Sequence, residues 1–182
     1  IYRPDIYRSA LQSTAADLPN ASAKVEGALQ VPTPVASKSG RMVLGPDGFF
    51  DGRLFDPAWD EDSILQLIEH PAAAAFVAQA REPKQLAGFV IGQIAADEAE
   101  ILSLGVAPEW QRRGIARHMV EGLVRAARLA EVRRLFLEAA ADNTAAIKLY
   151  KGLGFAAVGT RKDYYRRPTG QPVDAVVLAL DL

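Results

Sequence analysis

The segment 106–117 (VAPEWQRRGIAR) constrains the fold of this chain more than any other part of its sequence. The apolar run 101–106 before it is typical of a buried strand, and Pro108 marks the end of that strand. A short loop with two arginines and Gly114 then leads directly into a long helical pattern. The first turn of a helix carries unpaired N–H groups and the positive end of the helix dipole, so this segment predicts a site for a phosphate-bearing ligand.

The helix predicted after Gly114 runs to about residue 130. Its apolar residues lie on one face and its charged residues on the opposite face, as expected for a helix that lies on a sheet. The apolar face holds Ile115, Met119, Leu123 and Ala126, and the charged face holds Arg117, Glu121, Arg125 and Arg128.

The other patterns predict a mixed sheet with helices on its faces. Strands are expected at 41–44, 74–80, 86–95, 100–106, 135–139, 155–165 and 175–180, and shorter helices at 61–69 and 144–153. Residues 1–40 are rich in Ala, Ser, Thr and Pro and have a weak apolar pattern, which predicts an N-terminal extension or arm. Residues 41–182 are expected to form one domain.

Composition excludes several classes of function. The net charge of −1 and the pI of about 6.2 argue against binding to nucleic acid or to a membrane surface. The sequence has no cysteine, which removes disulfides and thiolate nucleophiles and fits a reducing cytoplasm. The two histidines, His70 and His118, lack the spacing of metal ligands, so no metal site is expected. No run is long and apolar enough to span a membrane, and no signal peptide is recognisable.

Several motifs together identify a family. Gln111-Arg112-Arg113-Gly114-Ile115-Ala116 is similar to the Q/R-x-x-G-x-G/A loop of the GCN5-related N-acetyltransferases (GNAT). The segments 135–139 (LFLEA), 143–150 (NTAAIKLY) and 152–155 (GLGF) resemble more narrowly the branch that acetylates the N-terminal alanine of a ribosomal protein. The resemblance covers residues 57–182 and is densest in the second half.

This resemblance implies a mixed, mostly antiparallel α/β sheet of about six to seven strands with helices on both faces. It implies an enzyme that transfers acetyl from acetyl-CoA, without a metal, to an amine, with a protein N-terminal α-amine favoured. The absence of cysteine and of a nucleophilic serine motif favours direct transfer in a ternary complex. Two alternatives remain open, namely an acetyltransferase for a small-molecule amine or antibiotic, and a non-enzymatic acyl-CoA-binding module.

The resemblance also implies which residues hold the coenzyme. In the family, backbone amides of the loop bind the diphosphate, and an outward-turned strand edge binds the pantetheine arm by β-augmentation. One amide of that strand is also a candidate oxyanion donor, and Gly105 is consistent with a bulge or a close backbone approach. The residues in question are Arg112, Arg113, Gly114, Ile115, Ala116 and Arg117 for the diphosphate, and Leu104, Gly105, Val106 and Asn143 for the arm.

Glu138 and Tyr150 are the candidate catalytic residues. Period-two alternation places Glu138 on the same face as Phe136, where a partly apolar setting would raise its pKa and make it a better base. The alternative is a solvent-facing glutamate at a strand end. Tyr150 lies seven residues after Asn143, on the same helix face, and its alternative is a half-buried core aromatic. The resemblance implies a general base at Glu138 and a proton donor at Tyr150.

Tyr164 and Tyr165 are candidate contacts for the acetyl acceptor. They lie at the end of a predicted strand, in a hairpin that lines the peptide site of related enzymes. An exposed aromatic pair at a strand end is the alternative. At the front of the chain, residues 45–55 are too short and turn-rich for the helix usual in the family. Two alternatives follow: either residues 1–40 supply the helix that residues 45–55 lack, or the acceptor groove is built differently from that of the family.

Overall fold

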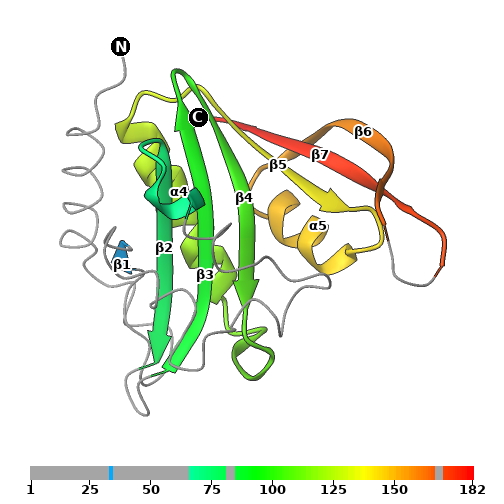
Figure 1. Ribbon diagram of the computed structural model, residues 1–182, viewed down its shortest axis with the longest axis horizontal. Coiled ribbons are helices and arrows are strands. Elements are labelled where there is room, and N and C mark those ends of the chain that lie inside the picture. The colour runs from blue at the N-terminus through cyan, green and yellow to red at the C-terminus, as the bar shows by residue number, and fades with distance from the viewer. Residues whose placement is uncertain (1–32, 35–65, 81–84, 167–169) are drawn as a thin grey trace.

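A single twisted sheet organises the molecule (Figure 1). The structure is a computed structural model that describes residues 33–34, 66–80, 85–166 and 170–182. Its seven strands lie in the order β1-β2-β3-β4-β5-β7-β6. Neighbours are antiparallel except β4 and β5, which are parallel, so the predicted mixed, mostly antiparallel sheet is confirmed. The bounds are β1 (Thr33–Pro34), β2 (Ala73–Ala80), β3 (Gln85–Ala95), β4 (Glu98–Val106), β5 (Arg134–Ala140), β6 (Ala156–Tyr165) and β7 (Val173–Asp181).

Several predictions fall wholly or partly on residues that the structure does not describe. The strand expected at 41–44 and the segment 45–55 lie outside the described residues. Of the predicted helix 61–69, the structure describes residues 66–69, and these are helical. Within the predicted N-terminal arm, residues 1–40, only Thr33 and Pro34 are described, and they pair with β2 as β1. The division into an arm and a domain from residue 41 stays a prediction.

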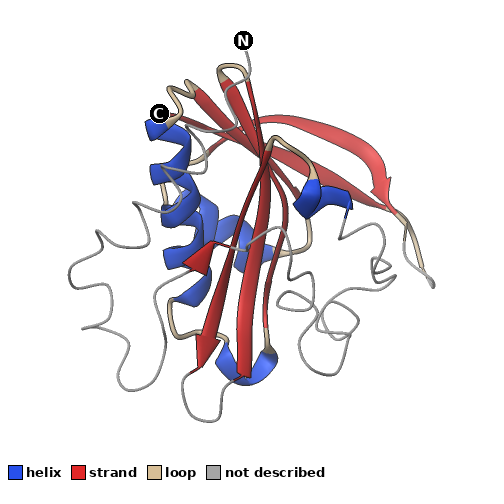
Figure 2. Ribbon diagram, turned by 60° about the vertical axis from the view of Figure 1, so that its left-hand side comes forward, coloured by secondary structure: helices blue, strands red, loops and turns tan. Residues whose placement is uncertain are grey.

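The helix α4 (Ile115–Leu129) covers one face of the sheet, and its bounds agree with the prediction. Its apolar residues Met119 and Leu123 are fully buried against the face of β2 and β3 that carries Phe76 and Val90. On the other face, Ile68 packs with a separate cluster that includes Phe89. Figure 2 shows α4 and the helical residues 66–69 on opposite sides of the sheet. Helices on both faces are therefore confirmed.

The strands β4 and β5 separate part-way along their length (Figure 1). Their parallel ladder runs from Glu98↔Arg134 to Ile101↔Leu137, whereas β4 continues alongside β3 as far as Val106. Between these two regions the β3–β4 register shifts, with Leu102 as the additional residue on β4. A bulge bends the strand that contains it, so this one turns the end of β4 away from β5.

Gly105 was a candidate for such a bulge, and the structure corrects this, because Gly105 pairs regularly with Phe89. The close approach in this region is centred on Gly88 of β3 instead. A Cβ at Gly88 would lie 2.8 Å from the Gly105 carbonyl oxygen and 3.0 Å from Met119 Cε. Only glycine at position 88 allows β3, β4 and α4 to pack this closely, since real Cβ atoms do not approach backbone oxygen at that distance.

Candidate functional site

A cavity of about 1010 Å³ lies where β4 and β5 have separated. One wall is the end of β4, the loop after it and the first turn of α4. The opposite wall is α5 (Thr144–Lys151), which begins as predicted and ends two residues earlier. The lining residues are Leu104, Val106, Trp110, Gln111, Arg112, Gly114, Ile115, Ala116, Arg117, Asn143, Thr144, Ala145, Ala146, Ile147, Lys148, Leu149, Lys151 and Gly152.

The loop before α4 has a left-handed backbone at two positions. Gly114 is the N-cap residue, with φ +82°, and Arg112 has φ +62°. Gln111 donates from Nε2 to the Val106 carbonyl at 3.1 Å, which ties the loop to the end of β4. Ile115 and Ala116 at the start of α4 line the cavity. Because N–H groups at a helix start lack partners within the helix, donors gather at this wall.

The cavity wall is cationic. Arg112, Arg117, Lys148 and Lys151 line it, and no acidic side chain is among the described residues that do so. Arg117 donates from Nη2 to the Gly152 carbonyl at 3.2 Å, which joins the two walls. An anionic group at the start of α4 would therefore meet a helix dipole and positive side chains together.

Two predicted coenzyme contacts, Gly105 and Arg113, do not line the cavity. Gly105 is buried on β4, where its carbonyl oxygen lies close to Gly88 of β3. The Arg113 guanidinium carbon lies 4.8 Å from the centre of the Trp110 ring, a cation–π contact. Because the Arg113 side chain packs on Trp110 within the loop, only the backbone of Arg113 remains as a candidate ligand contact.

Asn143 is the N-cap of α5. Its Oδ1 accepts a hydrogen bond from the Ala146 backbone N–H at 3.1 Å, as helix capping requires. The residue also lines the cavity. The capping bond uses the oxygen, which leaves the Nδ2 group of the same amide as a possible donor to a ligand.

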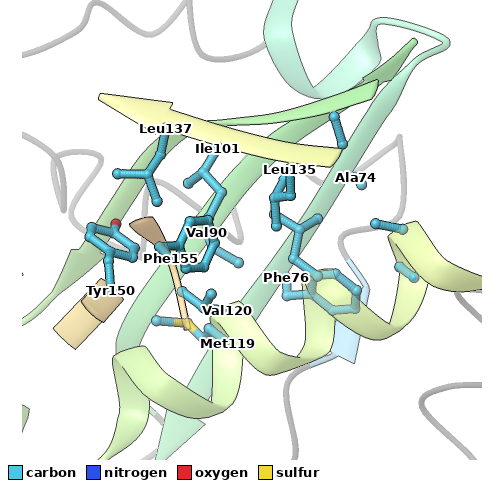
Figure 3. Close-up of a cluster of buried hydrophobic side chains, with 14 of the residues drawn as sticks. Ala74, Phe76, Val90, Ile101, Met119, Val120, Leu135, Leu137, Tyr150 and Phe155 are labelled. Atoms are coloured by element: carbon cyan, nitrogen blue, oxygen red, sulfur yellow. The ribbon is translucent and has the colours of Figure 1, made fainter. Parts of the chain in front are cut away.

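Tyr150 lies in the hydrophobic core rather than on the cavity wall (Figure 3). It is 5% exposed and makes an edge-on contact with Phe155, with ring centres 5.6 Å apart. Burial raises the pKa of the Tyr150 phenol to about 12, and the neighbouring Tyr165 contributes to the shift. Its neighbours Leu149 and Lys151 do line the cavity. The phenol therefore stays protonated at neutral pH beside the cavity.

Glu138 lies on the other face of β5. It shares that face with Phe136, and β4 places Glu100 beside Phe136. The Glu138 side chain is 19% exposed, and its Oε1 accepts a hydrogen bond from Arg161 Nη1 at 2.9 Å. The carboxylate is thus a mostly buried, paired group rather than a solvent-facing one.

Glu100 is a further candidate site residue, which the sequence patterns did not indicate. Partial burial raises the pKa of the Glu100 carboxyl, the nearby Glu138 raises it further, and Arg161 lowers it. Two carboxylates on neighbouring parallel strands therefore interact at this point. Alternation along 98–106 could have placed Glu100 on a face, but nothing local in the sequence predicts which residue of β5 it meets.

Tyr164 and Tyr165 are brought to the same region by β6. Their rings make an edge-on contact at 5.2 Å, and Tyr164 is 44% exposed. Burial raises the pKa of Tyr165, and Glu138 is the next largest cause. Tyr165 also raises the pKa of Tyr150, so it is close to both candidate catalytic residues. Glu138 and Tyr150 thus approach β5 from opposite faces with Tyr165 near each.

A bulge in β6 positions these tyrosines. The β6–β7 register shifts between Arg161 and Tyr165, and Asp163 has φ +53°. Asp174 of β7 holds the bulge, because it accepts hydrogen bonds from Lys162 Nζ at 2.7 Å and from the Asp163 backbone N–H at 3.0 Å. These two hydrogen bonds hold the pKa of Asp174 below its usual value.

Comparison with known proteins decides the family. The family model of the acetyltransferase (GNAT) family matches residues 46–155, which is more than half of the chain. This chain belongs to the GNAT family. The predicted membership, the predicted fold and the assignment to an N-acetyltransferase family are confirmed.

Two curated relatives of this GNAT chain share a name. The [ribosomal protein bS18]-alanine N-acetyltransferase of Salmonella typhimurium is 39% identical over 98 residues, which are 54% of this chain and 66% of the relative. The enzyme of the same name from Haemophilus ducreyi is 36% identical over 101 residues, covering 56% of this chain and 70% of the relative. The matched part therefore spans just under two thirds of the Salmonella enzyme.

Solved structures agree on the GNAT fold. The ribosomal-protein-S18-alanine N-acetyltransferase from Escherichia coli superimposes with a TM-score of 0.73 at 27% identity, covering 82% of this chain and 92% of that one. A chain of the NatC complex bound to Gag peptide and CoA also gives a TM-score of 0.73, covering 85% and 99%. At 20% identity, that second likeness concerns the fold alone.

The sequence predicts neither a metal site nor a membrane-spanning segment, and two findings on the described part of this GNAT domain bear on these predictions. Among the described residues, no group of three or more His, Cys, Asp or Glu side chains is placed to hold a metal ion. No helix in the same residues is long and apolar enough to cross a membrane.

The raised pKa of Tyr150 predicts a late ionisation and an alkaline loss of stability. An unfolded tyrosine ionises near pH 10, so the contribution of Tyr150 is complete below pH 10 and is lost as the pH rises toward 12. Two pKa units correspond to about 3 kcal/mol. Ultraviolet titration should show one tyrosine ionising near pH 12 that is missing in Tyr150→Phe. If the tyrosine lost in Tyr150→Phe were one that ionises near pH 10 in the wild type, this environment would be contradicted.

Proposed function

We propose that this protein transfers an acetyl group from acetyl-CoA to an amine, and that the acceptor is the N-terminal α-amine of a protein. The observation that carries the proposal is the cationic cavity between the start of α4 and α5, whose α5 wall includes Leu149 and Lys151, the neighbours of Tyr150. The names of the relatives favour an acceptor of the ribosomal protein bS18 type, which starts with alanine. A ribosomal acceptor agrees with the cytoplasmic location predicted from the sequence.

The cavity fits acetyl-CoA by the chemistry of its walls. The backbone N–H groups of residues 112–117, with Arg112 and Arg117, would hold the diphosphate. The edge of β4 at Leu104–Val106, released from β5, would bind the pantetheine arm through its backbone, together with the Asn143 amide. When bound, the coenzyme supplies an acetyl group activated as a thioester.

Glu138 and Tyr150 would divide the proton transfers between them. Glu138 accepts a proton from the acceptor ammonium on one face of β5, directly or through water, and so produces the nucleophilic amine. Tyr150 approaches from the opposite face and holds its phenol proton at neutral pH, which suits a donor to the leaving sulfur. With no cysteine in the chain, transfer is direct within a ternary complex.

The acid–base chemistry favours an α-amine over a lysine side chain. An α-amine has a pKa of about 7.7–8.0, whereas that of lysine is about 10.4. The difference corresponds to about 3–4 kcal/mol of extra deprotonation for lysine. A single carboxylate such as Glu138 is therefore sufficient for the terminal amine.

A peptide array with labelled acetyl-CoA tests the acceptor class. We expect label on peptides that begin with Ala at a rate well above that on Ser- or Met-starting peptides, polyamines and aminoglycosides. Preferred labelling of the small amines would replace the protein acceptor with a small-molecule one. Coenzyme binding with no labelled product would favour a binding module over an enzyme.

A further inference from the structure

The Arg161 guanidinium occupies a position that is built for a cation. Its Nη1 donates to Glu138 Oε1 at 2.9 Å, and its central carbon lies 4.0 Å from the centre of the Tyr164 ring. A carboxylate and an aromatic face are the groups that proteins use to bind an ammonium. Glu100 and Tyr165 also interact electrostatically with Arg161. The guanidinium therefore has cation-binding groups from three strands around it.

Small residues let this side chain lie across the sheet. Glu138 is opposite Val177 of β7, and Val177 is opposite Gly159 of β6, two residues before Arg161. Arg161 itself is opposite Ala175. The distance from β6 to β5 is two strand spacings, roughly 10 Å, and small residues beside Val177 give a long side chain room to span it. Gly159 and Ala175 leave that path open.

The two partners of the ion pair differ in how firmly they are held. The Glu138 side chain is 19% exposed, whereas the Arg161 side chain is 53% exposed on an edge strand. An ion pair with one half-exposed partner is weak enough to exchange. Two carboxylates and one guanidinium also leave this cluster with one negative charge when all three are ionised. The carboxylates form the fixed site, and the guanidinium is the exchangeable part.

We propose that Arg161 is a positioning residue that holds the place of the acceptor ammonium, which displaces it from Glu138 when the substrate binds. This inference rests on the function proposed above. After the exchange, the ammonium N–H bond breaks and its proton passes to the Glu138 carboxylate. Arg161 stays protonated and retains the Tyr164 ring as a partner. The affinity for the acceptor is then set by competition between the substrate ammonium and the Arg161 guanidinium for the Glu138 carboxylate.

The test compares acceptor binding to the full chain in the presence of CoA. Arg161→Met removes the competing charge but keeps the length of the side chain, and Arg161→Lys keeps the charge. Arg134→Met is the matched control, because Arg134 makes a similar cross-strand ion pair with Asp181 at 2.6 Å, at the far end of β5. Calorimetry would use an Ala-starting peptide and an analogue with a hydroxyl in place of its α-amine.

Arg161→Met should bind the ammonium peptide roughly two- to fivefold more tightly, the effect of removing a weak competing ion pair. Its affinity for the neutral analogue should not change, and its KM for acetyl-CoA should stay at the wild-type value. Arg161→Lys and Arg134→Met should bind both peptides as the wild type does. The proposed role of Arg161 as a placeholder for the ammonium would be overturned by any of three results for Arg161→Met. These are weaker binding of both peptides, an equal change in affinity for both, and no change in affinity.

The outcome is separable from that of the proposed function. If the wild type acetylates no peptide, the proposed acceptor class fails, whereas the difference between charged and neutral peptides still reports on the cation site. If the wild type binds neither peptide, the placeholder role is overturned as well.

Discussion

Gly114→Trp should abolish measurable binding of acetyl-CoA. Gly114 has φ +82°, so any L-residue there is strained, and it lines the cavity at the start of α4. A tryptophan would add a bulky ring where the diphosphate is expected. Isothermal titration calorimetry with acetyl-CoA would measure the loss, and thermal unfolding would establish that the variant is folded.

Two further variants separate blockage from backbone strain. Gly114→Ala brings the same left-handed strain, but among the described residues its Cβ would meet only His118, at 3.7 Å, so it should weaken binding far less. Gly170→Trp is the matched control, because Gly170 has φ +110°, does not line the cavity, and has no atom of the described residues beyond its chain neighbours within 4 Å of its Cβ position. Unchanged affinity in Gly114→Trp would show that the coenzyme binds elsewhere.

Glu138→Gln and Tyr150→Phe should each lower kcat by at least about tenfold with little change in acetyl-CoA affinity. Glutamine keeps an oxygen that can accept from Arg161 but is not a base. Phenylalanine keeps the edge-on contact with Phe155 but has no proton to donate. Steady-state kinetics with an Ala-starting peptide, with calorimetry for the coenzyme, would measure both effects.

Glu98→Gln is the control for the carboxylate. Glu98 is exposed and lies on the same face as Glu100, at the start of β4. The Glu98→Gln variant should have the same kcat as the wild type. Near-normal kcat in both Glu138→Gln and Tyr150→Phe would remove the acid–base assignment. A loss of coenzyme affinity equal to the loss of kcat would instead indicate a binding role.

The parts of the fold that local sequence controls were predictable. The α4 helix begins after Gly114 because apolar residues recur at helical spacing, and β4 stops before Pro108. The strands β5 to β7 and helix α5 lie within two residues of their predicted ends. The loop between β4 and α4 follows the end of a predicted strand and precedes a predicted helix, so most of the proposed coenzyme cavity could be located from the sequence.

The remainder depends on contacts between distant segments. Glu100 meets Glu138 only because β4 and β5 pair in one parallel register, and a long helix separates these strands in the sequence. The side chain of Arg113 packs on Trp110, although its position in the loop suggested the ligand. The seven-residue spacing from Asn143 to Tyr150 could not predict that Tyr150 packs edge-on against Phe155 in the core, because Phe155 lies beyond the end of α5.

A crystal structure of the full chain grown with acetyl-CoA is the most direct test of the central claim, that the turn into α4 binds the coenzyme diphosphate. We expect the diphosphate against the backbone of residues 112–117 and the sulfur between Glu138 and Tyr150. Coenzyme bound at another surface, with this cavity left empty, would contradict the account.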